Sequence, residues 1–273
     1  MSRTISIGNV KVGGNRPLAL IAGPCVIESR DGCLKLAEKL AALSRREGIP
    51  LIFKASYDKA NRSSLSSFRG LGIEEGLAVL GEVRATLGVP VLTDVHETSQ
   101  VASAAEVVDV LQIPAFLCRQ TDLLLAAGRT GKTINVKKGQ FVAPGDVRHI
   151  VAKIESTGNR SILVTERGAC FGYNNLVADM RSLLILRELG YPVVFDATHS
   201  VQRPGAGGDH SAGDGRWAPA LARAAVATGC DAVFVETHLR PEKALSDREN
   251  LIPFVKLASL WRVLRRIDEI VDG

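Results

Sequence analysis

Residues 51–64 of the chain read LIFKASYDKANRSS. The first three, Leu51–Phe53, are apolar and predict a buried strand. The eleven residues that follow contain two lysines, one arginine and three serines, at the point where the predicted strand gives way to a loop. Lysine and arginine donate charge-assisted hydrogen bonds to phosphate and carboxylate oxygens. The stretch therefore predicts an α/β fold in which a strand end presents an anion-binding loop, the alternative being a solvated basic loop.

Seven further runs resemble Leu51–Phe53. They are Leu18–Ala22, Val89–Thr93, Val107–Ile113, Thr133–Val136, Ser161–Thr165, Pro192–Phe195 and Asp231–Val235. These runs are mostly apolar along their length instead of alternating, which is typical of parallel strands that are covered on both faces.

Amphipathic segments separate the apolar runs. Leu36, Leu40 and Leu43 have helical spacing, and Gly48 is placed to end that helix. Similar patterns recur at residues 77–87 and 260–271. Eight strand–helix units in 273 residues predict one (β/α)8 domain, a TIM barrel, spanning the whole chain. An open, doubly wound sheet is the structural alternative.

Two segments are additions to a bare barrel. Residues 4–12 alternate around Gly8-Asn9, which predicts an N-terminal hairpin that closes the N-terminal end of the barrel. Residues 203–215, RPGAGGDHSAGDG, are rich in glycine and follow the seventh predicted strand. We expect this segment to form a mobile lid, and a plain flexible connection is the alternative.

Composition narrows the class of protein. Hydrophobic residues make up 46% of the chain, enough for a large core, and the net charge of +5 suits an enzyme that attracts small anions. Aromatic residues are only 5% and no long basic run occurs, so we expect no nucleic-acid partner. Five cysteines without a CxxC pair favour a reducing compartment. Without a signal-peptide pattern or an apolar stretch of ~20 residues, we expect a soluble cytoplasmic protein that does not contact membranes.

Four potential metal ligands follow the predicted strands: Cys25, His199, Glu236 and Asp247. The carboxyl ends of barrel strands face the active site, so these side chains are expected to converge there. A mixed set of thiolate, imidazole and carboxylate suits a divalent transition metal. Each residue alone has another interpretation, because Cys25 could be a small buried hydrophobe, His199 a general base or phosphate ligand, and Asp247 a helix cap.

Five cations follow the same strand ends: Lys54, Lys59, Arg62, Lys137 and Arg167. Around one cavity they would repel one another strongly unless something neutralised them. We therefore expect more than one anionic group to bind there. Pairing with neighbouring carboxylates could account for one or two of the five.

The segments at the strand ends also resemble a known family. They are IAGPC (21–25), FKASYDKANRSS (53–64), SFRG (67–70), TDVHE (93–97), IPAFLCRQTDLL (113–124), INVKKGQF (134–141), TERG (165–168), DATHSVQ (196–202) and VETHLRPEKALSD (235–247). In them the chain is similar to 3-deoxy-D-manno-octulosonate-8-phosphate synthases along nearly its whole length. The most specific piece is KANRSS, because the related 3-deoxy-heptulosonate-7-phosphate synthases carry a lysine-proline-arginine version from which Asn61 departs.

The resemblance implies a transferase of lipopolysaccharide (Kdo) biosynthesis. Its members condense phosphoenolpyruvate with D-arabinose 5-phosphate and water, release phosphate, and assemble as homotetramers of (β/α)8 barrels. The nearest alternative is the heptulosonate synthase, which uses erythrose 4-phosphate, and Asn61 argues against it. A sialic-acid-type synthase is more remote, since its acceptor sugar lacks this phosphate. A non-catalytic anion-binding barrel is the alternative from another class, and the complete set of metal and cation residues argues against it.

The resemblance also implies a metal. Cys25, together with Ala-Leu-Ser-Asp at 244–247, is similar to the metal-dependent branch of the family. The implied ligands are Cys25, His199, Glu236 and Asp247. A cysteine ligand favours Zn or Fe(II), and Mn or Co are further options.

The implied substrate contacts fall into two groups. Phosphoenolpyruvate is expected at Lys54, Lys59, Gln112, Lys137 and Arg167, and arabinose 5-phosphate at Asn61, Arg62 and Ser63. Three further residues complete the substrate-binding set: Phe116 on the interface side of the pocket, Gln140 at a strand end, and Arg119 reaching the sugar phosphate from a neighbouring subunit. Asp94 is expected near the sugar and the metal. The candidate catalytic residues are Lys54, Lys59, Asp94, Lys137, Arg167 and His199.

Overall fold

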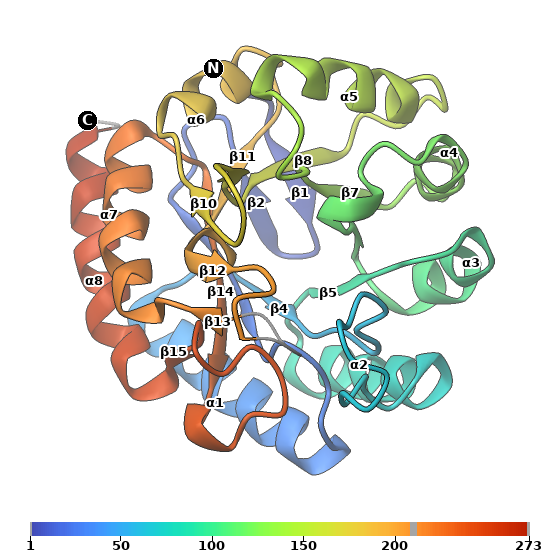
Figure 1. The fold of residues 1–273 in the computed structure, drawn as a ribbon, viewed down its shortest axis with the longest axis vertical. Coiled ribbons are helices and arrows are strands. Elements are labelled where there is room, and N and C mark those ends of the chain that lie inside the picture. The colour runs from blue at the N-terminus through green and yellow to red at the C-terminus, as the bar shows by residue number, and fades with distance from the viewer. Residues whose placement is uncertain (1, 208–211, 272–273) are drawn as a thin grey trace.

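Eight parallel strands close into a barrel that a ring of helices surrounds (Figure 1). The computed structural model describes residues 2–207 and 212–271. The strands follow one another around the barrel in chain order, and the last pairs in parallel with both the first and the seventh. This closure confirms the predicted (β/α)8 barrel and excludes the open sheet.

The barrel strands coincide with the eight apolar runs. They are β3 (Ala19–Gly23), β4 (Leu51–Lys54), β5 (Val91–Asp94), β6 (Val110–Ile113), β7 (Thr133–Lys137), β8 (Ile162–Glu166), β11 (Val193–Asp196) and β14 (Ala232–His238). All are buried along their length except for the last residue of β14, as expected for strands covered on both faces. The main difference is at β6, which begins three residues late because Val107 still belongs to the preceding helix.

The outer ring consists of the helices between the strands. They are α1 (Arg30–Glu47), α2 (Ile73–Leu87), α3 (Thr98–Val107), α4 (Thr121–Arg129), α5 (Val147–Glu155), α6 (Arg181–Arg187), α7 (Ala218–Thr228) and α8 (Phe254–Val271). The ends of α1 have clear chemical causes. The Ser29 hydroxyl accepts a hydrogen bond from the Gly32 amide, and Gly48 ends the helix in the left-handed region, with φ 66°, as predicted.

The predicted N-terminal hairpin consists of β1 (Ile5–Ile7) and β2 (Val10–Val12), which pair antiparallel. The apolar side chains of both strands pack in one cluster with residues of the barrel strands, among them Ile21 and Leu92. Val12 is fully buried there. The hairpin therefore closes the end of the barrel opposite the carboxyl ends of its strands, and Figure 1 shows both of its strands against the barrel.

Short strands also form within the loops. They are β9 (Ala169–Cys170) with β10 (Leu176–Val177), β12 (Gln202–Arg203) with β13 (Ala212–Gly213), and β15 (Ile252–Pro253) beside β14. The candidate lid, residues 203–215, includes Arg203 of β12 and all of β13, and its central residues 208–211 lie outside the described part of the chain. Mobility of that segment stays a prediction.

Candidate functional site

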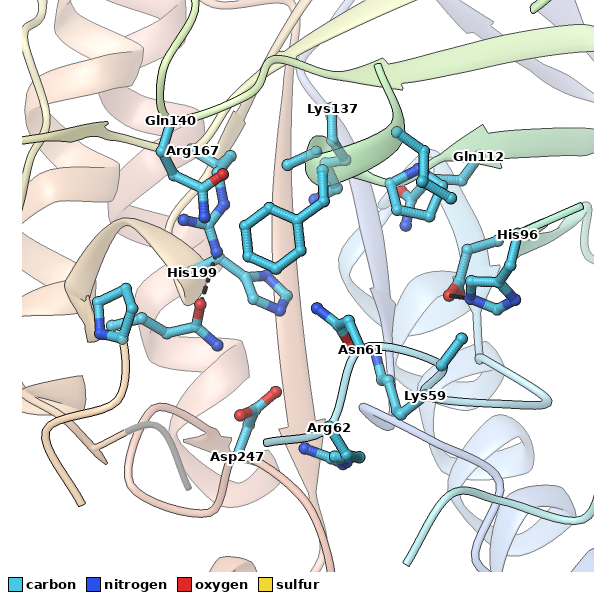
Figure 2. A pocket seen from close by; sticks show the side chains of 18 of the residues that line it. Lys59, Asn61, Arg62, His96, Gln112, Lys137, Gln140, Arg167, His199 and Asp247 are labelled. Atoms are coloured by element: carbon cyan, nitrogen blue, oxygen red, sulfur yellow. Dashed lines mark hydrogen bonds and ion pairs between the residues drawn. The ribbon is translucent and has the colours of Figure 1, made fainter. Parts of the chain in front are cut away.

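A cavity of about 440 Å³ lies at the carboxyl ends of the barrel strands (Figure 2). Most of the residues predicted for the site line it. They are Lys59, Asn61, Arg62, Ser63, Asp94, Gln112, Phe116, Lys137, Gln140, Arg167, His199, Glu236 and Asp247. Residues dispersed over nearly 190 positions in the sequence thus meet because each lies near or beyond the carboxyl end of a barrel strand.

Three predicted residues do not line the cavity. Lys54 is buried beneath it, where its ammonium group donates to Glu236 Oε1 at 2.6 Å. Cys25 is also buried, next to Asp247. Arg119 is exposed outside the cavity, so this chain alone does not bring its guanidinium to the site. Its expected approach from a neighbouring subunit stays a prediction.

Three potential metal ligands gather at one side of the cavity. One ligand atom each of Cys25, Glu236 and Asp247 lies within 4.8 Å of the others. Glu236 Oε2 lies 3.5 Å from His199 Nε2, which places the fourth predicted ligand at the edge of the group. Asp247 has a φ of 48°, an uncommon conformation that often marks functional positions.

The chemistry of this group fits a divalent transition metal. Burial, and then the charge of Glu236, raise the pKa of the Cys25 thiol, which disfavours the thiolate unless a cation lies beside it. His199 Nδ1 lies 2.7 Å from the Asp196 carboxylate, so its other ring nitrogen, Nε2, points to the Glu236 side, where it can act as a ligand. A carboxylate that orients a histidine in this way is common behind metal ligands.

Asp196 connects the histidine to the anion-binding side chains. The carboxylate is fully buried and contacts the Lys137 ammonium group as well as His199. Burial works against its charge, but His199 and Lys137 together hold the pKa of Asp196 below its usual value. The sequence interpretation did not assign Asp196 a role, although Asp196 lies at a strand end and opens the quoted segment DATHSVQ.

Lys137 and Arg167 form the deep cationic part of the cavity. The Lys137 ammonium group lies 3.3 Å from the centroid of the Phe234 ring, and burial lowers the pKa of Lys137 to about 8 despite the nearby Asp196. Arg167 donates one bond to Gln202 Oε1 at 2.5 Å, while its buried Nη1 has no partner among the described residues. A buried donor without an acceptor is costly, so an anionic ligand fits beside it.

Residues 61–63 of the basic loop supply the outer part of the cavity, whereas Lys59 of the same loop reaches the buried Glu236 carboxylate at 3.6 Å. Arg62 is half-buried and donates to the Phe68 carbonyl at 3.3 Å and to the Ser246 hydroxyl. Figure 2 shows Arg62 beside Asp247 on one side of the cavity, with Lys137 and Gln112 on the other.

Three of the five predicted cations pair with carboxylates, Lys54 and Lys59 with Glu236 and Lys137 with Asp196, which is one more than expected. Among the described residues, Arg167 in the deep part and Arg62 in the outer part have no such pair, so each remains available to an anionic group.

A further acid–imidazole pair lines the cavity between these groups. The Asp94 carboxylate lies 3.0 Å from His96 Nε2 and also accepts a bond from Ser56. Burial opposes ionisation, but Lys59 and His96 keep the pKa of Asp94 below its usual value, and Asp94 in turn raises the pKa of His96. His96 was not among the predicted site residues, although it follows Asp94 in the quoted segment TDVHE.

A (β/α)8 barrel whose strand ends enclose two groups of cations is typical of enzymes that act on small phosphorylated molecules. The chain belongs to the DAHP synthetase I family, whose model matches residues 3–272. This match confirms the family resemblance of the strand-end segments. Among the described residues, no helix combines the length and apolar character needed to cross a membrane.

Similar proteins cover the whole chain. The 2-dehydro-3-deoxyphosphooctonate aldolase of Trichlorobacter lovleyi is 57% identical over 271 residues, which are 99% of this chain and all of the relative. The proteins of the same name from Geobacter metallireducens and Citrifermentans bemidjiense are 59% and 58% identical over 99% and 100% of this chain. In both cases the full length of the relative is covered.

Proposed function

We propose that the protein condenses phosphoenolpyruvate with D-arabinose 5-phosphate and water to give 3-deoxy-D-manno-octulosonate 8-phosphate and phosphate. The observation that carries this proposal is the full-length identity of 57–59% to 2-dehydro-3-deoxyphosphooctonate aldolases. The reaction belongs to the biosynthesis of Kdo, the acidic sugar of lipopolysaccharide. The relatives and Asn61 together favour the five-carbon acceptor over erythrose 4-phosphate.

The cation groups account for how two anions can react. Lys137 and Arg167 would neutralise the phosphate and carboxylate of phosphoenolpyruvate, while Arg62, at the outer part of the cavity, would hold the phosphate of the sugar. Holding both substrates close together in the reactive orientation removes much of the entropic part of the activation barrier, and preorganised charges stabilise the transition state.

The bond changes follow from the chemistry of an enol phosphate. The C3 carbon of phosphoenolpyruvate attacks the aldehyde carbon of the sugar, and the new carbon–carbon bond leaves cationic character at C2. Water adds at C2, and collapse of the resulting tetrahedral centre breaks the C2–O bond and expels phosphate. In this scheme the buried carboxylates Asp94 and Asp196 keep His96, His199 and Lys137 oriented around the reacting atoms.

The proposed cofactor is a divalent metal held by Cys25, His199, Glu236 and Asp247, with Zn or Fe(II) favoured and Mn or Co acceptable. The closeness of three of these ligand atoms supports the assignment. When bound, such an ion polarises a carbonyl oxygen or lowers the pKa of a water molecule.

The assembly proposed is a homotetramer in the cytoplasm. Phe116 is half exposed at the cavity lining and Arg119 lies exposed just beyond it, which suits a subunit interface next to the site. The five cysteines are free in the structure, as in proteins of a reducing compartment. Light scattering of the purified protein measures the mass directly, and a monomer would contradict the tetramer.

Product identification tests the proposed reaction. The purified protein is incubated with phosphoenolpyruvate and arabinose 5-phosphate, and the organic product is identified by mass spectrometry. We expect an eight-carbon 3-deoxy acid monophosphate. If neither arabinose 5-phosphate nor, in a parallel incubation, erythrose 4-phosphate gives a product, the chain would be better described as a non-catalytic anion-binding barrel.

A further inference from the structure

Lys138 and Glu166 are two buried ionic residues that lie behind the cavity and do not line it. Their side chains are 1% and 2% exposed, and Lys138 Nζ lies 3.5 Å from Glu166 Oε2. Removing two charges from water costs about as much as their attraction returns, so such a pair adds little net stability. A role in placing other groups is a better explanation of the pair.

Each member of the pair is the immediate sequence neighbour of a cation of the deep part of the cavity. Lys138 directly follows Lys137 on β7, and Glu166 directly precedes Arg167 at the end of β8. The two strands are neighbours, and the Lys138 amide donates to the Thr165 carbonyl at 2.8 Å. The ion pair therefore lies just beyond the last paired residues of β7 and β8, Lys137 and Thr165.

The Glu166 carboxylate holds the backbone that carries Arg167. Its Oε1 accepts hydrogen bonds from the amides of Arg167 and Gly168, at 2.9 and 2.7 Å. Gly168 has a φ of 90°, a conformation that side-chain-bearing residues rarely adopt, so the chain turns sharply at this point. One oxygen thus fixes both the turn and the direction in which Arg167 leaves the strand.

Lys138 holds the neighbouring turn in a similar way. Its ammonium group donates to the carbonyls of Gly139 and Val142, at 3.3 and 3.2 Å. Gln140 lies in this turn, and its carbonyl accepts a bond from the Cys170 amide at 2.9 Å, which joins the two turns. Figure 2 shows Gln140 and Arg167 together at one side of the cavity.

We propose that Glu166, neutralised by Lys138, is a positioning residue for the phosphate of phosphoenolpyruvate. The carboxylate acts through the two backbone amides, so that the Arg167 guanidinium points into the cavity before the substrate arrives. The identity of this ligand rests on the proposed function above. Glu166 itself makes no contact with substrate, because it does not line the cavity.

Two charge-balanced double variants separate positioning from charge. In Lys138→Met/Glu166→Gln the amide oxygen still accepts from both backbone amides, whereas Lys138→Met/Glu166→Ala lacks any acceptor. We expect the alanine variant to raise the KM of phosphoenolpyruvate about tenfold and that of arabinose 5-phosphate less than about twofold. The glutamine variant is expected to keep both constants within about threefold of wild type.

Other outcomes of the same kinetic measurements would contradict the proposal. Equal KM values in the two double variants, or equal changes for both substrates, would overturn the positioning role. If the alanine variant does not fold, as judged by circular dichroism, Glu166→Asp replaces it, because the shorter side chain withdraws its oxygen from the two amides. For that variant, an unchanged KM of phosphoenolpyruvate would overturn the proposal.

A binding measurement keeps this proposal separate from the proposed reaction. Calorimetric titration of wild type and both double variants with inorganic phosphate does not depend on turnover. If wild type forms no octulosonate product, the proposed reaction fails, yet weaker phosphate binding by the alanine variant alone would still support the positioning role. Equal phosphate affinity in the two double variants would overturn it.

Discussion

Individual residues in the cavity differ mainly in how much water surrounds them. Burial lowers the pKa of Lys137 to about 8, although the neighbouring Asp196 opposes this shift. Arg62, in contrast, is half-buried in the outer part of the cavity. Cys25 is buried beside carboxylates that disfavour its thiolate. These environments lead to three predictions about single side chains.

The first concerns pH. Lys137 must be protonated to bind an anion, and in the free enzyme it loses its proton as the pH rises through about 8. The value of kcat/KM for phosphoenolpyruvate should therefore fall about tenfold per pH unit above that point. In Lys137→Arg this decline should move beyond the measurable range, since arginine stays charged. An identical decline in both proteins would assign it to another group.

The second concerns the sugar phosphate. Arg62→Ala removes a charged donor from the outer part of the cavity, so the KM of arabinose 5-phosphate should rise about a hundredfold while that of phosphoenolpyruvate changes little. Arg69→Ala is the matched control, because Arg69 pairs with Asp58 at the surface and does not line the cavity. Equal losses for both substrates in Arg62→Ala would contradict the division into two cation groups.

The third concerns the metal. A neutral hydroxyl is a poorer ligand than a thiolate, so Cys25→Ser should lose most of the bound metal and most of the activity. Metal content per chain is measured by mass spectrometry after purification. Cys170→Ser serves as the control, since Cys170 is exposed on β9 and is expected to keep both properties. Full activity of Cys25→Ser without metal would contradict the proposed site.

The elements of the fold were largely predictable because their signals are local. Apolar runs gave the barrel strands, and Gly48 and Gly88 end α1 and α2 in the left-handed conformation that glycine favours. The exposed side of α8 was less predictable. Val263 and Val271 belong to its apolar pattern but are more than 40% exposed, since the pattern covers more of the helix than the barrel can bury.

The N-terminal hairpin provides a prediction at this scale. Val12 is fully buried at the closed end of the barrel, so Val12→Ala should lower the free energy of unfolding by about 2 kcal/mol. Activity of the folded enzyme should stay unchanged, because the cavity is at the other end. Urea denaturation measures the effect, and Ser6→Ala on the exposed side of the hairpin is the control. Equal stability of the two variants would argue against the hairpin as a plug.

For the molecule as a whole, the sequence predicted which residues meet but not how they pair. Strand-end positions brought thirteen predicted residues to one cavity lining. The contacts of Asp196, His96, Lys138 and Glu166 depend on the register of neighbouring strands and on which way each side chain turns beyond the last pair. Such details have no local sequence signal, so these residues had to come from the structure.

The most direct test of the proposed reaction is the rate at which phosphate is released from phosphoenolpyruvate with each of two sugar phosphates. With arabinose 5-phosphate we expect steady release that requires both substrates, and with erythrose 4-phosphate little or none. Equal or faster release with the four-carbon sugar would contradict the account and assign the protein to heptulosonate synthesis.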